Sequence, residues 1–118
     1  MSEERLVRAG DVYLVDLEPT RGSEQSGVRP VLVISADELH RKSRRMIVCP
    51  ITSNMAPWTT KVPLPTACRT KGMVLTDQIR AVDMKARILR HIETLPPDFV
   101  TTIRSYVGRL LELEVRLS

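Results

Sequence analysis

The sequence predicts a small domain that is mainly β-structure and carries one α-helix at its C-terminal end. A length of 118 residues suits a single domain. Short runs rich in Val, Ile and Leu, separated by Gly, Pro and polar residues, recur as far as Glu93, as expected for short strands. After Leu95 the apolar residues instead return every three or four positions, which is the spacing of one helix face. Together these observations indicate a compact β-barrel capped by a helix.

Five or six short strands are expected, and proline helps to place them. Pro30 is tolerated at the start of the second strand, where it removes no central ladder bond. Pro63 and Pro65 interrupt the fourth segment, which predicts a strand at the edge of the sheet. The expected strands are residues 11–17, 29–35, 45–52 and 59–65, followed by the partly alternating segments MVLTDQIRAVD and KARILRHIE.

Two helices are expected between and after these strands. Ser35 and Glu38 fit an S-x-x-E capping box, in which side chains satisfy the first free amides of a helix. This pattern predicts a short helix through about Lys42. The C-terminal helix follows a pair of prolines, which suit first-turn positions. Its predicted apolar face is formed by Phe99, Ile103, Tyr106, Val107, Leu110 and Leu111.

Composition predicts a soluble, cytoplasmic protein with reduced thiols. The 42% apolar and 27% charged content is that of ordinary globular proteins. No apolar run approaches the roughly 20 residues needed to cross a bilayer, and the charged start MSEERLVRAG lacks the apolar stretch of a signal peptide. Cys49 and Cys68 are therefore expected to remain reduced rather than to pair.

Charge and ligand spacing narrow the possible partners. A net charge of +4 and a pI near 9.5 favour polyanionic partners, either nucleic acid or an acidic protein, although many ordinary proteins carry a similar excess. His40 and His91 have no Cys or carboxylate at a metal-ligand spacing. The sequence therefore predicts no metal and no cofactor.

The polar loop between the first two strands ends at Arg29 and enters an apolar strand directly. If the second and third strands pair antiparallel, the start of one lies beside the end of the other. Arg29 and Thr52 would then share one rim of the barrel, with Glu24 on the loop that leaves it. Ser53 and Asn54 follow at the same place. A guanidinium, a carboxylate and a hydroxyl are thus expected to converge.

Three segments carry a resemblance to a known family. They are GDVYLVDLEPTRGSEQSGVRPVLVIS, CPITSN and GMVLTDQIRAVD, followed by the amphipathic terminal segment. Together, from Gly10 to about Leu113, they resemble the MazF/PemK family of toxin endoribonucleases. The resemblance implies a small SH3-like β-barrel of the MazF/CcdB kind and a homodimer. It also implies metal-independent cleavage of single-stranded RNA and neutralisation by a cognate antitoxin.

The same resemblance implies roles for particular residues. By their positions in the motifs, Arg29 and Thr52 would be the catalytic pair and Glu24 an acidic active-site residue. One departure concerns Asp77, because plasmid-type relatives place an arginine two residues before this aspartate, whereas this chain has Leu75. This departure weakens the case for a catalytic role of Asp77. That Asp77 holds a loop by hydrogen bonds is an equally good interpretation.

These residue types suit cleavage of RNA by its own 2′-hydroxyl, which leaves a 2′,3′-cyclic phosphate and a 5′-hydroxyl. The planar guanidinium of Arg29 matches two phosphate oxygens, but it stays protonated and so moves no proton. Glu24 is the better base candidate if burial raises its affinity for protons. Thr52 would hydrogen-bond a phosphate oxygen or the 2′-hydroxyl. Alternatively, Glu24 and Arg29 could pair as a surface bridge, and Thr52 could simply end a strand.

Further residues are candidates for contacts with RNA. Arg44 and Arg45 end a basic run that could follow an RNA backbone or form an ordinary solvated face. Trp58 could stack on an unpaired base, dock an antitoxin, or lie over the barrel edge. Glutamine side chains could read base edges. The predicted RNA-binding set is Gln25, Ser53, Asn54, Trp58, Arg44, Arg45 and Gln78.

Two other functions stay open. Gyrase-poisoning toxins resembling CcdB share this fold but bind a protein and cleave nothing. They end in Trp-Gly-Ile, whereas this chain ends in EVRLS. A catalytically silent RNA- or protein-binding barrel would not need Arg29 to meet Thr52, and a nuclease assay separates it from an enzyme.

Overall fold

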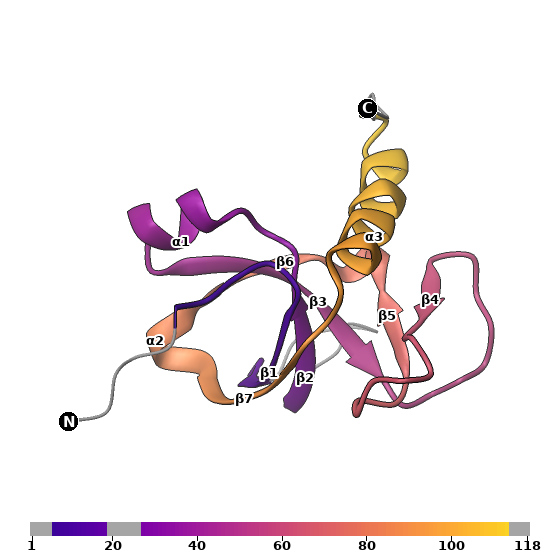
Figure 1. Ribbon diagram of the computed structural model, residues 1–118, viewed down its shortest axis with the longest axis horizontal. Helices are drawn as coiled ribbons and strands as arrows, with labels where there is room; N and C mark the ends of the chain where they lie inside the picture. Colours follow the sequence, from indigo (N-terminus) through magenta and orange to yellow (C-terminus); the bar gives the residue numbers. More distant parts are fainter. Residues whose placement is uncertain (1–5, 19–26, 114–118) are drawn as a thin grey trace.

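The computed structural model describes residues 6–18 and 27–113. This part is mainly β-structure with one long helix at its C-terminal end, which confirms the predicted fold class (Figure 1). The strands are β1 (Asp11–Asp16), β2 (Val28–Val33), β3 (Arg45–Thr52), β4 (Lys61–Pro63), β5 (Met73–Leu75), β6 (Arg80–Asp83) and β7 (Ile88–Thr94). The helices are α1 (Asp37–Lys42), the 3₁₀ turn η1 (Thr76–Gln78), α2 (Met84–Arg87) and α3 (Pro97–Leu110). Within the described ranges, no helix is both long and apolar enough to span a membrane.

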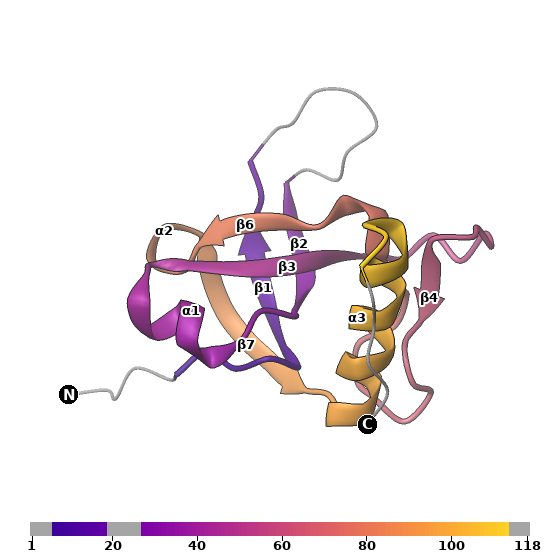
Figure 2. The same ribbon diagram turned by 90° about the horizontal axis from the view of Figure 1, so that it is seen from above.

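The long strand β3 organises a curled antiparallel sheet. Strands follow the order β4-β5-β3-β2-β1-β7, and β6 also pairs with β3. The first half of β3 borders β6, whereas its last two residues border β5. In Figure 2, β3 and β6 run together across β1 and β2, which shows how strongly the sheet bends. No ladder among the described residues joins the end strands β4 and β7, so the barrel is open along one side.

Alternation along the strands divides the core into two clusters. The first cluster includes Val12, Leu32 and Cys49, and α3 covers it through Ile103 and Val107. The second cluster lies on the opposite face and is formed by Tyr13, Val15, Leu17, Val31, Val33, Met46, Val48 and Val82. Residues at the strand ends that point to the same face as the second cluster lie at the edge of the core, where a ligand can contact them.

The predicted capping box does not form. The residue before α1 is Ala36, and no side chain caps the first turn of the helix. Ser35 is buried and instead accepts a hydrogen bond from the Ile47 amide at 2.8 Å. Glu38 pairs with Lys42 at 2.8 Å on the exposed face of α1. The prediction was wrong because β3 lies close enough to claim the Ser35 hydroxyl.

Other element predictions are partly corrected. The segment MVLTDQIRAVD is not one strand but two, because η1 separates β5 from β6. The segment KARILRHIE begins in α2, which Asp83 caps by accepting a hydrogen bond from the Ala86 amide at 2.9 Å. Leu110 and Leu111 are exposed rather than buried, because the end of α3 extends beyond the sheet (Figure 1). The edge position of β4 is confirmed, and both cysteines are free thiols.

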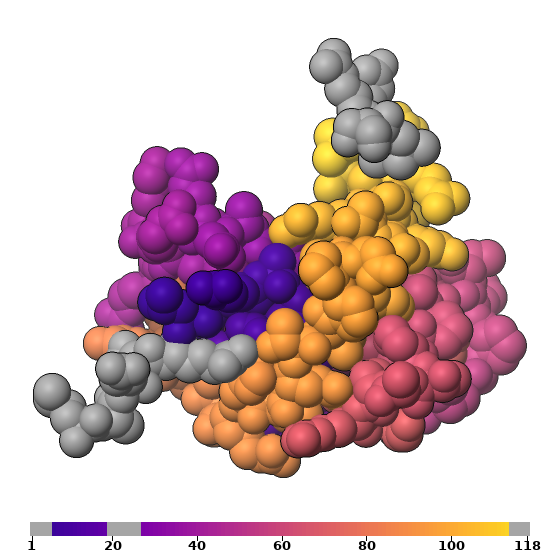
Figure 3. All heavy atoms as spheres, viewed as in Figure 1, coloured from indigo at the N-terminus to yellow at the C-terminus, as the bar shows by residue number. Residues whose placement is uncertain are grey.

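α1 and α3 stand apart on one side of the molecule. Figure 3 shows the segment that leads into β1, in indigo, on the surface between these two helices. The two helices therefore cover different parts of the sheet, α3 over the first cluster and α1 beside the start of β3.

Candidate active site

Arg29 and Thr52 lie at the same end of the paired strands β2 and β3. β2 and β3 pair antiparallel, with Val31 opposite Pro50. Two residues further along this register come Arg29 and Thr52. The paired register ends at Val31 and Pro50, so Arg29 and Thr52 lie just beyond it, and alternation places them on the same face of the two strands. The antiparallel pairing on which this prediction depended is observed, and it places Arg29 and Thr52 at one rim.

Both side chains belong to the face of the second core cluster. Arg29 continues the alternation of Val31 along β2, and Thr52 continues that of Val48 along β3. Arg29 is half-buried at this position. The rim is thus the polar end of an apolar layer, where a charge meets fewer competing waters than on an open surface.

Arg80 adds a second guanidinium to this face. It precedes Val82 of the second cluster by two positions on β6, and its Nη2 donates to the carbonyl oxygen of Leu17 at 3.3 Å. Leu17 lies where the β1–β2 loop begins. Arg80 was not among the predicted site residues. Its alternation with Val82 would have indicated it if the start of β6 had been predicted correctly.

The position of Thr52 depends on a close approach of β5. Thr52 is only 5% exposed, and its Oγ1 accepts a hydrogen bond from the Asn54 amide at 3.1 Å, so the hydroxyl proton can be donated to a ligand. Gly72 has φ +139°, and a Cβ at that position would lie 2.3 Å from the Thr52 carbonyl oxygen. Only glycine allows the chain to pass Thr52 at this distance.

The base of the β1–β2 loop is held at the same rim. The Leu17 amide donates to the Gly27 carbonyl oxygen at 2.9 Å. Glu18 has a left-handed backbone, with φ 59°, and its carboxylate pairs with Arg87 at 2.6 Å. Glu24 and Gln25, two of the predicted site residues, lie outside the described residues.

The segment after Thr52 presents Ser53, Asn54 and Trp58 beside the rim. All three are exposed, and Trp58 is 67% exposed, so it does not lie over the barrel edge. Asn54 Oδ1 accepts a hydrogen bond from the Ala56 amide at 2.9 Å. Lys61 Nζ donates to the carbonyl oxygens of Asn54 and Ala56 at 3.3 and 3.0 Å. These bonds shape the segment and leave the indole face open to solvent.

η1 carries Asp77 and Gln78. Its loop contact is made by Thr76, whose Oγ1 donates to the Thr60 carbonyl oxygen at 2.6 Å. Asp77 is exposed, whereas Gln78 is half-buried. Burial, assisted by the Asp77 carboxylate, raises the pKa of the Cys49 thiol to about 12. Cys49 is therefore a protonated core residue and not a nucleophile.

Arg44 and Arg45 do not lie at this rim. They stand at the start of β3, while Thr52 ends it, and the strand has eight residues. At about 3.3 Å per residue the two ends are about 23 Å apart. Arg44 Nε lies 3.7 Å from the Asp83 carboxylate. The structure thus gathers Arg29, Thr52 and their neighbours at one end and places these two arginines at the other.

The histidines are held by hydrogen bonds within the fold. His40 Nδ1 lies 2.8 Å from the Val7 carbonyl oxygen, and its Nε2 lies 2.6 Å from Ser35 Oγ. His91 Nε2 lies 3.3 Å from the buried Asp11 carboxylate. Nowhere in the described ranges do three His, Cys, Asp or Glu side chains gather as metal ligands.

Sequence comparison identifies relatives of the whole domain. A family model of PemK-like, MazF-like toxins of type II toxin–antitoxin systems matches residues 8–111. Endoribonuclease PemK of Escherichia coli is 40% identical over 105 residues, which cover 86% of this chain and 77% of that protein.

Solved structures share the fold. MazF from Deinococcus radiodurans matches with a TM-score of 0.83 and 30% identity, covering 93% of this chain and 100% of that one. A MazE–MazF complex from the same organism gives a TM-score of 0.80 and 28% identity, covering 94% and 100%. A mycobacterial endoribonuclease in complex with its cognate antitoxin has the same fold, with a TM-score of 0.76, 19% identity, and coverage of 96% and 100%. The predicted MazF-like barrel is confirmed, and the chain belongs to the family of PemK-like, MazF-like toxins of type II toxin–antitoxin systems.

Proposed function

We propose that this protein is a toxin endoribonuclease that cleaves single-stranded RNA, including mRNA, at the rim formed by Arg29, Thr52 and Arg80. The observation that carries the proposal is the placement of Arg29 and Thr52 at the same end and on the same face of the adjacent strands β2 and β3. Membership of the toxin family and the 40% identity to the endoribonuclease PemK support this activity.

The reaction is attack of the 2′-hydroxyl on the adjacent phosphorus. The bond to the 5′-oxygen breaks, and the products carry a 2′,3′-cyclic phosphate and a 5′-hydroxyl. Arg29 stabilises the charge that develops on the phosphoryl oxygens, which is commonly the largest catalytic contribution. The Thr52 hydroxyl donates a hydrogen bond to a phosphate oxygen, since its own oxygen already accepts a hydrogen bond from the Asn54 amide. Glu24 is proposed to take the proton of the 2′-hydroxyl, the departing 5′-oxygen takes a proton from water, and no step uses a metal.

RNA is proposed to cross the rim along the exposed segment after Thr52. Trp58 offers an open ring for base stacking, worth about 1–3 kcal/mol per base. Arg44 and Arg45 would contact the RNA only if the RNA chain continues from the rim toward the far end of β3. The remaining proposed contacts are Gln25, Ser53, Asn54 and Gln78.

A cognate acidic antitoxin is the proposed regulator, and a homodimer in the cytoplasm is the proposed working form. Related toxins solved in complex with antitoxins support the first part. The net charge of +4 favours an acidic partner by long-range attraction. Such an antitoxin would block the groove that RNA needs.

The test is cleavage of a long single-stranded RNA by the purified protein with EDTA present. Cleavage should persist, with a cyclic phosphate on one product and a 5′-hydroxyl on the other. A 2′-deoxy nucleotide at the cut position should stop the reaction, because the nucleophile is missing. A duplex should resist, since in-line attack needs a splayed backbone. Cleavage of the deoxy-substituted strand would exclude this mechanism, and no cleavage at all would favour a gyrase-poisoning toxin or a silent binding barrel.

A further inference from the structure

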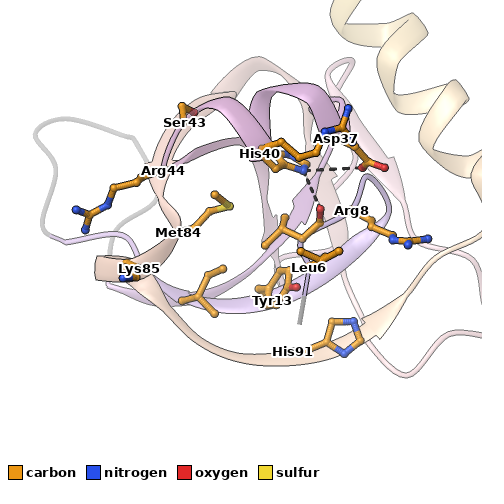
Figure 4. A pocket seen from close by; sticks show the side chains of 13 residues that line it. Leu6, Arg8, Tyr13, Asp37, His40, Ser43, Arg44, Met84, Lys85 and His91 are labelled. Atoms are coloured by element: carbon orange, nitrogen blue, oxygen red, sulfur yellow. Dashed lines mark hydrogen bonds and ion pairs between the residues drawn. The ribbon is translucent and has the colours of Figure 1, made fainter. Parts of the chain in front are cut away.

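A cavity of about 690 Å³ opens on the side of the molecule away from Thr52, between α1, α2, β7 and the segment that precedes β1 (Figure 4). Residues Ser43 and Arg44, which directly precede β3, line it. Thr52 ends the same strand, so the cavity and the proposed active site lie at opposite ends of β3. The proposed cleavage step uses no residue of this cavity, although Arg44 is also one of the proposed RNA contacts.

The floor of the cavity is apolar. Tyr13 of the second core cluster lies there, together with Met84 and Ile88, which pack against that cluster. Tyr13 is only 3% exposed, and its ring meets the ring of His91 edge-on. A large apolar side chain placed in the cavity would therefore extend the second cluster. It would remove the half-buried surface of Met84 and Ile88 from water.

The opening of the cavity is cationic. Among the described lining residues, Arg8, Arg41, Arg44 and Lys85 are basic and Asp37 is acidic, and Arg44 also lies 3.7 Å from the Asp83 carboxylate. Figure 4 shows Arg8 on one side of the opening and Arg44 and Lys85 on the other. A ligand that enters the cavity is thus flanked by positive charge on two sides, which favours carboxylates next to the apolar group.

The wall of the cavity is held in place before any ligand arrives. The carbonyl oxygen of Val7 only accepts, so His40 Nδ1 donates this 2.8 Å bond, and Nε2 shares a 2.6 Å hydrogen bond with the Ser35 hydroxyl. Ser35 in turn accepts from the Ile47 amide at 2.8 Å. This chain of bonds ties the segment before β1 to α1 and β3. A preformed pocket loses little entropy on binding.

We propose that this cavity is a second docking site, which binds an acidic peptide segment through one large apolar side chain inserted between Tyr13, Met84 and Ile88. The inference rests on the proposed function in one respect, since it assigns the segment to the cognate antitoxin. An RNA base is disfavoured because Met84 and Ile88 offer no ring for stacking, and the Tyr13 ring of the floor is buried. A second copy docked about a two-fold axis would bring the same four cations together, which repels.

The test compares binding of the purified cognate antitoxin with RNA cleavage in the same full-length variants. Arg8→Glu/Lys85→Glu reverses charge at the opening, and Met84→Gln makes the floor polar at nearly constant size. Arg90→Glu is the matched control, because Arg90 is exposed on β7 and does not line the cavity. The charge reversal and the floor variant should each weaken antitoxin binding at least tenfold and leave RNA cleavage unchanged. Arg90→Glu should change neither by more than twofold.

Overlapping labelled 15-residue peptides of the antitoxin identify the segment. One peptide should bind the wild-type protein but not the Arg8→Glu/Lys85→Glu variant. Its sequence should contain acidic residues and a large apolar residue, and replacing that apolar residue by serine should abolish binding. Wild-type antitoxin affinity in both cavity variants would overturn the proposal. So would reduced RNA cleavage with normal antitoxin binding, or a change of oligomeric state in the charge-reversed variant. A wild-type protein that cleaves no RNA would instead refute the proposed function while the binding comparison still decides the docking site.

Discussion

Arg29 has a backbone restricted on both sides. Its strand β2 pairs with β1 through Val15 opposite Arg29, and the following Pro30 disfavours any conformation but an extended one. The side chain therefore starts from a restrained backbone at the same strand end as Thr52, and little of the binding energy for a phosphate is lost in ordering the chain. This is the arrangement that electrostatic stabilisation of a transition state requires.

Replacing Arg29 by alanine should abolish most of the activity and leave the fold intact. Loss of one preorganised contact to the phosphoryl oxygens should lower kcat by about 10²–10³-fold. Single-turnover cleavage of a single-stranded RNA measures this effect, and circular dichroism checks the fold. Arg90→Ala, which removes an exposed arginine on β7, is the control and should cleave normally. Near-normal cleavage by Arg29→Ala would remove this residue from the site.

Gly72→Ala should damage the site without touching a catalytic side chain. The added Cβ would lie 2.3 Å from the Thr52 carbonyl oxygen, so β3 or β5 must move. A shift of the order of 1 Å at Thr52 should cost about 10²-fold in cleavage rate, and the strained backbone about 1–3 kcal/mol of unfolding free energy. Urea denaturation and cleavage rates measure the two effects.

Gly27→Ala is the matched control for the stability effect. Gly27 also has a positive φ, of 74°, but nothing lies within 4 Å of its added Cβ. It should lose only the cost of the left-handed backbone, about 1–2 kcal/mol. Wild-type cleavage by Gly72→Ala would show that the reaction tolerates displacement of Thr52.

Among the elements, β7 holds the β4–β5 connection in place through one carboxylate. Glu93 accepts hydrogen bonds from the Arg69 amide at 3.0 Å and from the Thr70 amide at 2.6 Å, and the Thr70 hydroxyl donates to it as well. Burial opposes ionisation of Glu93, but the bonds from Thr70 and Arg69 prevail and lower the pKa of this carboxyl. The connection leads to Gly72, so this contact supports the close approach of β5 to Thr52.

Glu93→Gln should lower stability and its pH dependence together. The lowered pKa means that the contribution of Glu93 is present above the pKa of an unfolded glutamate, about 4.3. It is lost as the pH falls through the lower pKa of the folded state. Urea denaturation at neutral pH should show a loss of about 0.5–1.5 kcal/mol.

Between pH 6 and 3 the unfolding free energy should fall less steeply in Glu93→Gln than in wild type. Glu38→Gln is the control, because the Glu38–Lys42 pair is exposed at both side chains. Its pH dependence should match that of wild type. Equal slopes in all three proteins would show that the Glu93 contacts contribute nothing to the folded state.

For the whole molecule, the two proposed functional surfaces lie at opposite ends of one strand. The rim at the end of β3 carries Arg29 and Thr52, and the cationic cavity lies beside its start. An extended acidic segment anchored in the cavity could follow the strand to the rim, a distance of about 23 Å. A disordered segment suits this span, since it covers a large area and becomes ordered only on binding.

RNA and antitoxin should therefore compete for this protein. An RNA made uncleavable by a 2′-deoxy nucleotide at the cut position is titrated into the complex of toxin and labelled antitoxin. Antitoxin should be displaced, and the affinity of each ligand alone should fall as salt rises, because both are polyanionic. A ternary complex formed without loss of affinity for either ligand would contradict this.

The sequence by itself determined the first three strands, the terminal helix, the edge position of β4, and the shared strand end of Arg29 and Thr52. Each follows from a local rule, namely alternation, proline placement, or the antiparallel pairing of neighbouring strands. Only the tertiary structure decided that Arg80 shares the rim, that Arg44 lies at the far end, and that Ser35 serves β3 instead of α1. These depend on the curl of the sheet, which brings residues distant in sequence together through long-range strand register, a quantity that no local pattern encodes.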